Sequence, residues 1–388
     1  MERVIVGLSG GVDSSVAAYL LKEQGYDVHA LFMKNWEDQE GVLTSSCTWE
    51  DDWLFAQMVA EKLNIPLHFV DFSKEYKKRV VDYMFSEYQK GRTPNPDVLC
   101  NREVKFDLFV SEAEKYDADY VATGHYCSKE IFENKQNIIH RLLAGNDKNK
   151  DQSYFLCQIS QKQLSKSLFP LGNIEKPQVR AIADKLQLAT AQRKDSQGIC
   201  FVGKVDLPQF LQQRLQPKKG DIIKIEQNEV PVNPGLPINE QARPYRFSAM
   251  KGKKVGEHNG AHYFTIGQRK GLNVGGTKEP LYVLGTDVDK NIIYVGEGSN
   301  HPGLFRKALF IENSEVHWLR HDLQMKSGEV QSFDFRIRYR QPLQKGKLIV
   351  RDEGAYIEFD EWQRGVTPGQ FAAWYKDGEL LGSGPIYS

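Results

Sequence analysis

The sequence of 388 residues predicts a multidomain α/β-plus-β protein, with an N-terminal doubly wound parallel sheet, a small mostly-β central domain and a C-terminal β-barrel. Three observations predict this fold class. Short apolar strands alternate with helical stretches over about the first 125 residues. Turn-forming residues become dense after about residue 205, and longer alternating strands begin near residue 305. Because the chain exceeds one typical core, we expect domains at 1–205, 206–303 and 304–388.

The N-terminal domain begins with an apolar run at residues 4–8, which predicts a buried strand, and continues with a helix over residues 14–24. Further strands are predicted at 28–33, Leu67–Asp71 and 120–123, with helices at Trp49–Leu63 and 76–89. The segment 107–116 leads into the last of these strands. Ligands of parallel sheets bind at the carboxyl ends of the strands, where Ser9, Met33 and Gly124 fall.

The remaining chain predicts β structure. The central segment contains turn formers over residues 231–244 and a β-like piece at 263–266. Apolar and polar residues alternate over 333–339, as in a strand with one buried face. Asp377-Gly378 between two apolar runs indicates a tight hairpin. Several short strands joined by turns predict a small barrel.

Composition argues against membrane, secreted, disulfide-rich and zinc-binding proteins. Hydrophobic residues make up 40% and charged residues 26% of the chain, as in an ordinary globular protein, and no apolar run reaches the length of a membrane span. The N-terminus does not resemble a signal peptide or an organelle presequence, so we expect a bacterial cytoplasmic protein without a membrane partner. Five cysteines without zinc spacing argue against a disulfide framework and against a structural metal.

Charge is distributed unevenly along the chain. The formal net charge is +0, yet residues 141–219 contain 14 Lys or Arg against 6 Asp or Glu, a local excess of +8. Such a block is compatible with a phosphate-binding face or with a solvated helical surface. Charge alone leaves both interpretations open.

The segment Ser9-Gly10-Gly11-Val12-Asp13-Ser14 lies between the first strand and the first helix. Two glycines permit a tight turn with room for a phosphate, and the free N–H groups of the helix would face that phosphate. The patterns Gly-x4-Gly-Lys-Ser/Thr and Gly-x-Gly-x-x-Gly are both missing from this segment. The segment resembles the PP-loop of the HUP-like ATP pyrophosphatase superfamily, which implies cleavage of ATP between the α- and β-phosphates. A turn without function is the alternative interpretation.

Two cysteines lie in distinctive segments. Cys100 follows Pro94-Asn95-Pro96-Asp97, in which two prolines fix the backbone and so provide a rigid platform for a reactive group. Cys200 ends Asp195-Ser196-Gln197-Gly198-Ile199-Cys200, in which Gly198 gives the chain freedom. The two thiols are 100 residues apart in the sequence, so the sequence alone does not bring them together. Taken singly, each could be a small buried hydrophobe, which is what we expect of Cys47, Cys127 and Cys157.

The whole set of motifs resembles the family of tRNA 2-thiouridylases. The matching segments are distributed from residue 7 to about residue 370: the phosphate loop, 32–36, 91–97, 123–126, 150–156, 194–201, 267–272 and 338–341. The resemblance implies a PRC-barrel-like central domain and a C-terminal barrel that contacts tRNA. It also implies replacement of the 2-oxygen of the wobble uridine by sulfur.

The resemblance assigns roles to individual residues. ATP would contact Gly7, Leu8, Ser9, Gly10, Gly11, Val12, Asp13, Ser14, Met33 and Gly124. Mg²⁺ is expected beside ATP, because neighbouring phosphates need a countercharge. Cys200 would carry the sulfur as a persulfide and Cys100 would act as the second thiol, leaving a Cys100–Cys200 disulfide to be reduced. A basic environment would give these thiols thiolate character. Asp97 would orient the base or move a proton.

The resemblance also implies contacts to nucleic acid. The target base would meet Asn95, Pro96 and Asp97, and tRNA would contact His125, Lys150, Asp151, Gln152, Arg338, Tyr339 and Gln370. Arg336, Arg338 and Arg340 could face phosphates, or form the wet face of a barrel strand. The expected partners are the lysine, glutamate and glutamine tRNAs and a sulfur-donor protein, either a relay protein or a cysteine desulfurase.

Two other functions are alternatives for this set of motifs. An ATP-dependent amidotransferase or ligase, such as NAD or GMP synthetase, would use the same loop with ammonia and would need no cysteine pair. A non-catalytic RNA-binding protein with a degenerate nucleotide site is the second alternative. The intact Ser9-Gly10-Gly11-Val12-Asp13-Ser14 loop argues against the latter.

Overall fold

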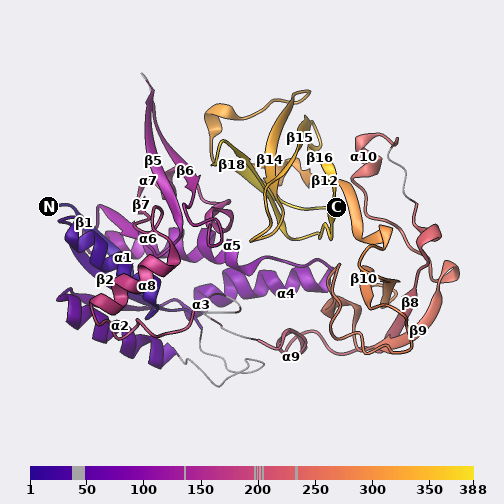
Figure 1. Cartoon of the computed structure of the whole chain (residues 1–388), viewed down its shortest axis with the longest axis horizontal. Helices are drawn as coiled ribbons and strands as arrows, with labels where there is room; N and C mark the ends of the chain where they lie inside the picture. The colour runs from indigo at the N-terminus through magenta and orange to yellow at the C-terminus, as the bar shows by residue number, and fades with distance from the viewer. Residues whose placement is uncertain are drawn as a thin grey trace.

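The computed structural model describes residues 1–36, 49–134, 137–195, 198, 200, 202, 205–231 and 235–388. Figure 1 shows three regions: the N-terminal domain, a yellow and orange C-terminal β domain, and a smaller β region beside it. Helix α4 (Asp82–Gln89) runs from the first region toward the third, beneath the C-terminal domain in this view. No helix in the described part of the chain is both long and apolar enough to span a bilayer.

A five-stranded parallel sheet forms the centre of the N-terminal domain. Its strand order is β3-β2-β1-β4-β7. The strands are β1 (Arg3–Gly7), β2 (Asp27–Lys34), β3 (Leu67–Asp71), β4 (Tyr120–Ala122) and β7 (Ser167–Leu168). Val4 and Val6 face one side of the sheet and Ile5 faces the other, because side chains alternate along a strand. Each side is covered by helices, so the predicted doubly wound sheet is confirmed.

The helices predicted at 14–24, Trp49–Leu63 and 76–89 lie close to their predicted positions, and the structure adds others that were not predicted. The helices are α1 (Val12–Glu23), α2 (Trp49–Leu63), α3 (Ser73–Tyr76), α4, α5 (Pro96–Cys100), α6 (Phe109–Glu114), α7 (Gln161–Ser165) and α8 (Lys176–Lys185). The predicted helix at 76–89 is one part of a longer run, in which the π-helical turn η1 (Lys77–Val81) joins α3 to α4. A second π-helical segment, η2 (Asn101–Leu108), joins α5 to α6.

The central region contains a four-stranded sheet in the order β10-β11-β8-β9. Its strands are β8 (Gly220–Lys224), β9 (Lys253–His258), β10 (Leu281–Asp287) and β11 (Ile292–Glu297). In the chain, helix α9 (Leu207–Gln212) precedes β8, and helix α10 (Ile238–Gln241) lies between β8 and β9. The β-like piece predicted at 263–266 is wrong. A 3₁₀ turn at Ala261–Tyr263 leads into a turn at Gly267, whose φ of 83° leaves the strand conformation.

The third sheet is antiparallel and has nine strands in the order β12-β16-β15-β14-β17-β18-β6-β5, with β13 on β18. Its strands are β5 (Cys127–Asn134), β6 (Asn137–Ala144), β12 (Phe305–Glu312), β13 (His317–Trp318), β14 (Val330–Arg336), β15 (Gln344–Arg351), β16 (Gly354–Arg364), β17 (Phe371–Lys376) and β18 (Glu379–Pro385). The predicted Asp377-Gly378 turn joins β17 to β18, with φ of 52° and 79°. Because β6 pairs with β18, this sheet includes a hairpin from the first 205 residues.

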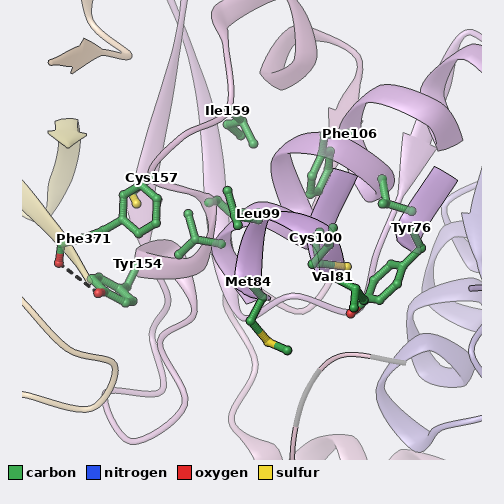
Figure 2. Close-up of a cluster of buried hydrophobic side chains, with 14 of the residues drawn as sticks. Tyr76, Val81, Met84, Leu99, Cys100, Phe106, Tyr154, Cys157, Ile159 and Phe371 are labelled. Atoms are coloured by element: carbon green, nitrogen blue, oxygen red, sulfur yellow. Dashed lines mark hydrogen bonds between the residues drawn. The ribbon is translucent and has the colours of Figure 1, made fainter. Parts of the chain in front are cut away.

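The largest apolar cluster lies where the regions meet. It contains Tyr76 and Cys100 of the N-terminal domain, Phe210 of α9 and Phe371 of β17. Figure 2 shows Tyr154 donating a hydrogen bond of 2.9 Å to the Phe371 carbonyl oxygen. The segment that contains Cys100 is therefore packed into a core shared with the C-terminal domain.

Candidate active site

The phosphate loop closes on itself between β1 and α1. The Ser14 hydroxyl donates to the Gly11 carbonyl (3.1 Å) and accepts from the Ser9 N–H (3.2 Å). Gly10 has a φ of +69°, and a Cβ there would lie 2.3 Å from the Asp52 carbonyl oxygen, so the position requires glycine. No side chain caps the N-terminus of α1 at Gly11, which leaves its first N–H groups to an anion.

Two residues predicted to contact ATP flank this loop. A Cβ on Gly7 would lie 3.3 Å from the Met33 side chain, so β1 and β2 approach closely at their carboxyl ends. A Cβ on Gly124 would lie 2.9 Å from the Ser14 nitrogen. Met33 and Gly124 thus lie at the same edge of the sheet as the loop, where a nucleotide would sit.

Ion pairs that were not predicted surround the loop. The Lys176 ammonium lies 2.7 and 2.9 Å from the two carboxylate oxygens of Asp13, and the Tyr126 hydroxyl donates to the same carboxylate (2.7 Å). Lys176 also pairs with Asp195 (2.8 Å), and Arg193 donates to the Gly10 carbonyl (2.7 Å). Lys176 and Arg193 both belong to the basic block at 141–219, and the excess of positive charge in that block is the sequence signal that could have identified them.

The pKa of Asp195 is held well below its usual range. Burial raises this pKa, but hydrogen bonds and charge from Lys150 and Lys176 lower it further than burial raises it. Asp195 also accepts from Arg180 (2.7 Å). The carboxylate therefore stays ionised at neutral pH and joins three basic side chains.

The structure brings Cys100 and Cys200 together. Asn95 caps α5 by accepting from the Val98 N–H (3.2 Å), and Cys100 ends this short helix with its side chain fully buried. The Cys100 and Cys200 side chains are hydrogen-bonded to each other, and both thiols are free. The Asp97 carboxylate accepts from the Cys200 N–H (3.0 Å). Three predicted catalytic residues thus form one centre, the thiol centre (Asp97, Cys100 and Cys200).

Two further residues contact the thiol centre and were not predicted. The Lys105 ammonium lies 3.8 Å from the Cys200 sulfur, and the Tyr76 hydroxyl donates to the Cys200 carbonyl (2.7 Å). The hydrogen bond to Cys100 and burial raise the pKa of the Cys200 thiol well above its ordinary value, whereas the charge of Lys105 lowers it. Lys105 lies five residues after Cys100, and η2 hydrogen-bonds with the i to i+5 spacing of a π-helix.

Residues 123–125 connect the phosphate loop to the thiol centre. Gly124 contacts the loop, while the charge of Lys105, which lies beside Cys200, acts on the next residue, His125. His125 is buried, and its Nδ1 lies 2.7 Å from the Thr123 hydroxyl. Burial and then Lys105 lower the pKa of His125 well below its ordinary value, so its imidazole is neutral at pH 7. Its predicted contact with tRNA stays a prediction.

Gln370 of the C-terminal domain supports the loop before the thiol centre. Its side-chain amide donates to the carbonyls of Thr93 (2.9 Å) and Pro94 (3.1 Å), and its oxygen accepts from Asn95 (3.3 Å). The central region reaches the same loop, since the hydroxyls of Thr93 and Thr265 lie 3.0 Å apart. Asn95 and Gln370, predicted to contact base and tRNA, are brought together.

The remaining residues predicted to contact tRNA lie in several environments. Asp151 is 5% exposed and pairs with Arg336 (2.7 Å), so Arg336 is a buried counter-ion and not part of a wet strand face. The Tyr339 ring packs on Phe155, with centroids 4.4 Å apart. Arg338 donates to the Gly365 carbonyl. Gln152 accepts from the Tyr126 N–H (3.0 Å), and Lys150 pairs with Asp195.

The other cysteines match the interpretation as small buried residues where the structure describes them. Cys127 and Cys157 are fully buried. Burial raises the pKa of the Cys157 thiol to about 12. Cys47 lies outside the described residues.

Comparison with known proteins identifies the family. Three family models match: a tRNA methyl transferase HUP domain at residues 2–204, a tRNA methyl transferase PRC-barrel domain at 238–297, and an aminomethyltransferase β-barrel domain at 309–386. The chain is 59% identical to the tRNA-specific 2-thiouridylase MnmA of Flavobacterium johnsoniae and 56% identical to that of Christiangramia forsetii. Both comparisons span 100% of each chain.

A solved 4-thiouridine synthetase–RNA complex with bound ATP is a remote likeness. It is 16% identical, covers 55% of this chain and 50% of its own, and has a TM-score of 0.34. The full-length relatives are far closer. By their identity and coverage, this chain belongs to the tRNA-specific 2-thiouridylase family.

Proposed function

We propose that this protein uses ATP to replace the 2-oxygen of the wobble uridine in tRNA with sulfur. The observation that carries the proposal is the pair of free thiols, Cys100 and Cys200, in a chain that also has an intact phosphate loop. Gly124 contacts the phosphate loop, and the next residue, His125, is within the electrostatic influence of Lys105, whose ammonium lies 3.8 Å from the Cys200 sulfur, which supports a short path between the two features.

Adenylation would be the first step. A uracil C2 oxygen is a poor leaving group, and its attack on the α-phosphate of ATP releases pyrophosphate and makes AMP the leaving group. The uncapped N-terminus of α1 and the tight turn at Gly10 support phosphate binding here. Ser9, Gly11 and Ser14 of the same loop would contact ATP, with Met33 and Gly124 at the edge of the loop.

Mg²⁺ fits this site as a companion of the phosphates. The loop contributes one carboxylate, Asp13, whose oxygens already accept from Lys176 and Tyr126. No cluster of three potential metal ligands occurs among the residues that the structure describes. Magnesium is commonly held by one or two carboxylates together with substrate phosphates. When bound, it would neutralise charge on ATP, while Lys176 holds Asp13 in place.

Sulfur transfer would follow in three nucleophilic steps, each of which releases a leaving group. The Cys200 thiolate attacks the outer sulfur of a donor persulfide, which gives the Cys200 persulfide and releases the donor thiolate. The terminal sulfur of Cys200, as an anion, attacks C2 and expels AMP, which forms a C–S bond. The Cys100 thiolate then attacks the inner sulfur of Cys200, which releases the 2-thiouridine anion and leaves a Cys100–Cys200 disulfide. An external thiol must reduce this disulfide before the next turnover.

The target base would reach the thiol centre from the anticodon loop. A base in a single-stranded loop is extruded at a cost of a few kcal/mol at most. Asn95, Pro96 and Asp97 would meet this base, and Asp97 would orient it or move a proton. His125, Lys150, Asp151, Gln152, Arg338, Tyr339 and Gln370 are the proposed tRNA contacts.

The partners follow from the same proposal. We expect the lysine, glutamate and glutamine tRNAs as substrates, and a relay protein or a cysteine desulfurase as the sulfur donor. A pair of free thiols that becomes a disulfide in each turnover, and must then be reduced, fits a reducing compartment such as the bacterial cytoplasm.

The test is an assay of the product. The enzyme is incubated with ATP, Mg²⁺, a persulfide donor and unmodified lysine tRNA, and digested tRNA is analysed for 2-thiouridine by mass spectrometry. Native enzyme should form the product, Cys200→Ser should form none, and Cys157→Ala, which alters a buried thiol outside the pair, should form it. Undiminished consumption of ATP by both Cys100→Ser and Cys200→Ser would favour the amidotransferase alternative.

A further inference from the structure

We infer that Lys105 is a positioning residue whose fixed positive charge stabilises the anionic sulfur on Cys200, first as thiolate and then as persulfide. This inference rests on the proposed sulfur transfer and adds a group that the reaction needs at the thiol centre. Its starting point is a contact of 3.8 Å between the Lys105 ammonium and the Cys200 sulfur.

The groups around Cys200 do not otherwise favour an anion. Cys100 and Asp97 of α5 both face Cys200 and raise the pKa of its thiol, and Tyr76 of α3 contributes a neutral hydroxyl to the Cys200 carbonyl. His125, in the segment after β4, is neutral at pH 7 because burial and the charge of Lys105 lower its pKa. The charge of Lys105 is the largest influence that lowers the pKa of the Cys200 thiol.

Lys105 itself is suited to carry a permanent charge. Burial lowers the pKa of a lysine, but the nearby Cys200, Cys100 and Asp97 raise the pKa of Lys105 above its usual value overall. The ammonium is therefore protonated whenever Cys200 carries the negative charge that the proposed steps require. It gains no proton and loses none in the proposed steps, so its contribution is charge and position alone.

The backbone explains how Lys105 reaches the sulfur. Cys100 ends α5, and η2 begins with the next residue. In a π-helix, residues five apart are hydrogen-bonded neighbours, whereas in an α-helix position i+5 lies on a different face. The π-helical winding thus directs Lys105 toward the same centre as Cys100, and such segments are common at functional sites.

Two steps of the proposed reaction place negative charge on Cys200. Its thiolate attacks the donor persulfide, and its terminal sulfur later attacks C2. A cation near a thiol lowers the thiol's pKa and so increases the fraction of the reactive thiolate. Without Lys105 the centre would hold the Asp97 carboxylate and two thiols, and ionising Cys200 would add a second negative charge in a half-buried site.

The test measures Cys200 directly and needs neither tRNA nor ATP. Reduced full-length enzyme is pulsed with iodoacetamide between pH 5 and pH 10, and alkylation of the Cys100 and Cys200 peptides is quantified by mass spectrometry. In Lys105→Gln, the pH midpoint for Cys200 should rise by about one unit or more, so that alkylation at pH 7.5 slows about tenfold. Lys105→Arg, which retains the charge, should keep the native midpoint within about half a unit.

Two controls separate charge from folding. Lys115→Gln removes an exposed lysine at the C-terminal end of α6 and should leave the midpoint unchanged. Thermal unfolding of each variant reports on stability, and Lys105→Met is the second neutral variant if Lys105→Gln does not fold. An unshifted midpoint in a folded neutral variant overturns the role of Lys105.

The outcome is independent of the proposed function. A shifted midpoint in an enzyme that forms no 2-thiouridine would retain Lys105 as the counter-ion of Cys200 and remove the thiolation proposal. An unshifted midpoint in an enzyme that does form 2-thiouridine would retain the thiolation proposal and remove Lys105 as the counter-ion of Cys200. A midpoint that shifts equally in Lys105→Gln and Lys105→Arg would assign the effect to packing and overturn the inference.

Discussion

The phosphate loop and the thiol centre are built in different ways. The loop is six consecutive residues, 9–14, which run from the end of β1 into the first turn of α1, and its own hydrogen bonds close it. The thiol centre joins Cys100 of α5 to Cys200 from a segment 100 residues later, and it depends on support from Gln370 of the C-terminal domain. A local motif thus carries its own geometry, whereas the sulfur site exists only in the assembled protein.

This difference predicts that substitutions at contacts between domains will affect the thiol centre more than the loop. The largest expected effect is on the buried pair of Arg336 and Asp151, whose side chains are 11% and 5% exposed. Arg336→Met leaves a buried carboxylate without its cation, which should lower the free energy of unfolding by about 3–5 kcal/mol. Calorimetry checks this, with the exposed Lys347→Met as control. A loss below about 1 kcal/mol would contradict the importance of the pair.

The second prediction breaks the loop itself. Gly10→Ala places a Cβ against the Asp52 backbone and forces a left-handed conformation on alanine, which should cost about 1–3 kcal/mol of stability and weaken ATP binding. Gly11→Ala is the matched control, since Gly11 has a φ of −96° and its nearest contact would be the Ser9 hydroxyl at 3.5 Å. Its cost should be about 0.5 kcal/mol. Chemical denaturation measures both stability costs, and equal costs would refute the argument; ATP titration measures the loss of affinity in Gly10→Ala.

The third prediction concerns support of the thiol centre. Gln370→Ala removes hydrogen bonds to Thr93, Pro94 and Asn95, and should lower kcat/KM for thiolation roughly fivefold, or about 1 kcal/mol, by loosening the approach to Cys100. ATP binding in the absence of tRNA should stay native. Gln331→Ala, on the exposed end of β14, is the control. Weakened ATP binding in Gln370→Ala would show that the two regions are not independent.

The smallest effect is pH-dependent. Because its pKa is depressed from 3.8, Asp195 contributes stability above the unfolded pKa, and this contribution is lost as the pH falls through the folded pKa. Asp195→Asn should therefore lower unfolding free energy by at most about 1 kcal/mol at pH 6, and the difference from native should vanish well below pH 4. Denaturation curves at several pH values measure it. Asp184→Asn, on the exposed side of α8, should show no such trend; a difference that persists at low pH would exclude the ionic cause.

Much of the fold could be predicted because its signals are local. Trp49–Leu63 and Leu67–Asp71 have their predicted bounds, since helical spacing and apolar runs are properties of adjacent residues. The piece at 263–266 was predicted wrongly, because its turn depends on hydrogen bonds with β10, for example from the Gly267 N–H to the Val283 carbonyl. The pairing of β6 with β18 was also beyond the reach of local patterns.

The sequence by itself determined the phosphate loop, because Gly10 and Ser14 lie four residues apart and short-range sterics shape the turn. It also named Cys100 and Cys200 through resemblance, without bringing them together. Only the tertiary structure decided that these thiols meet, that Arg336 is buried against Asp151, and that Lys105 reaches Cys200. The physical reason is that charge and burial act through space, so a side chain's ionisation depends on neighbours that folding brings from distant parts of the chain.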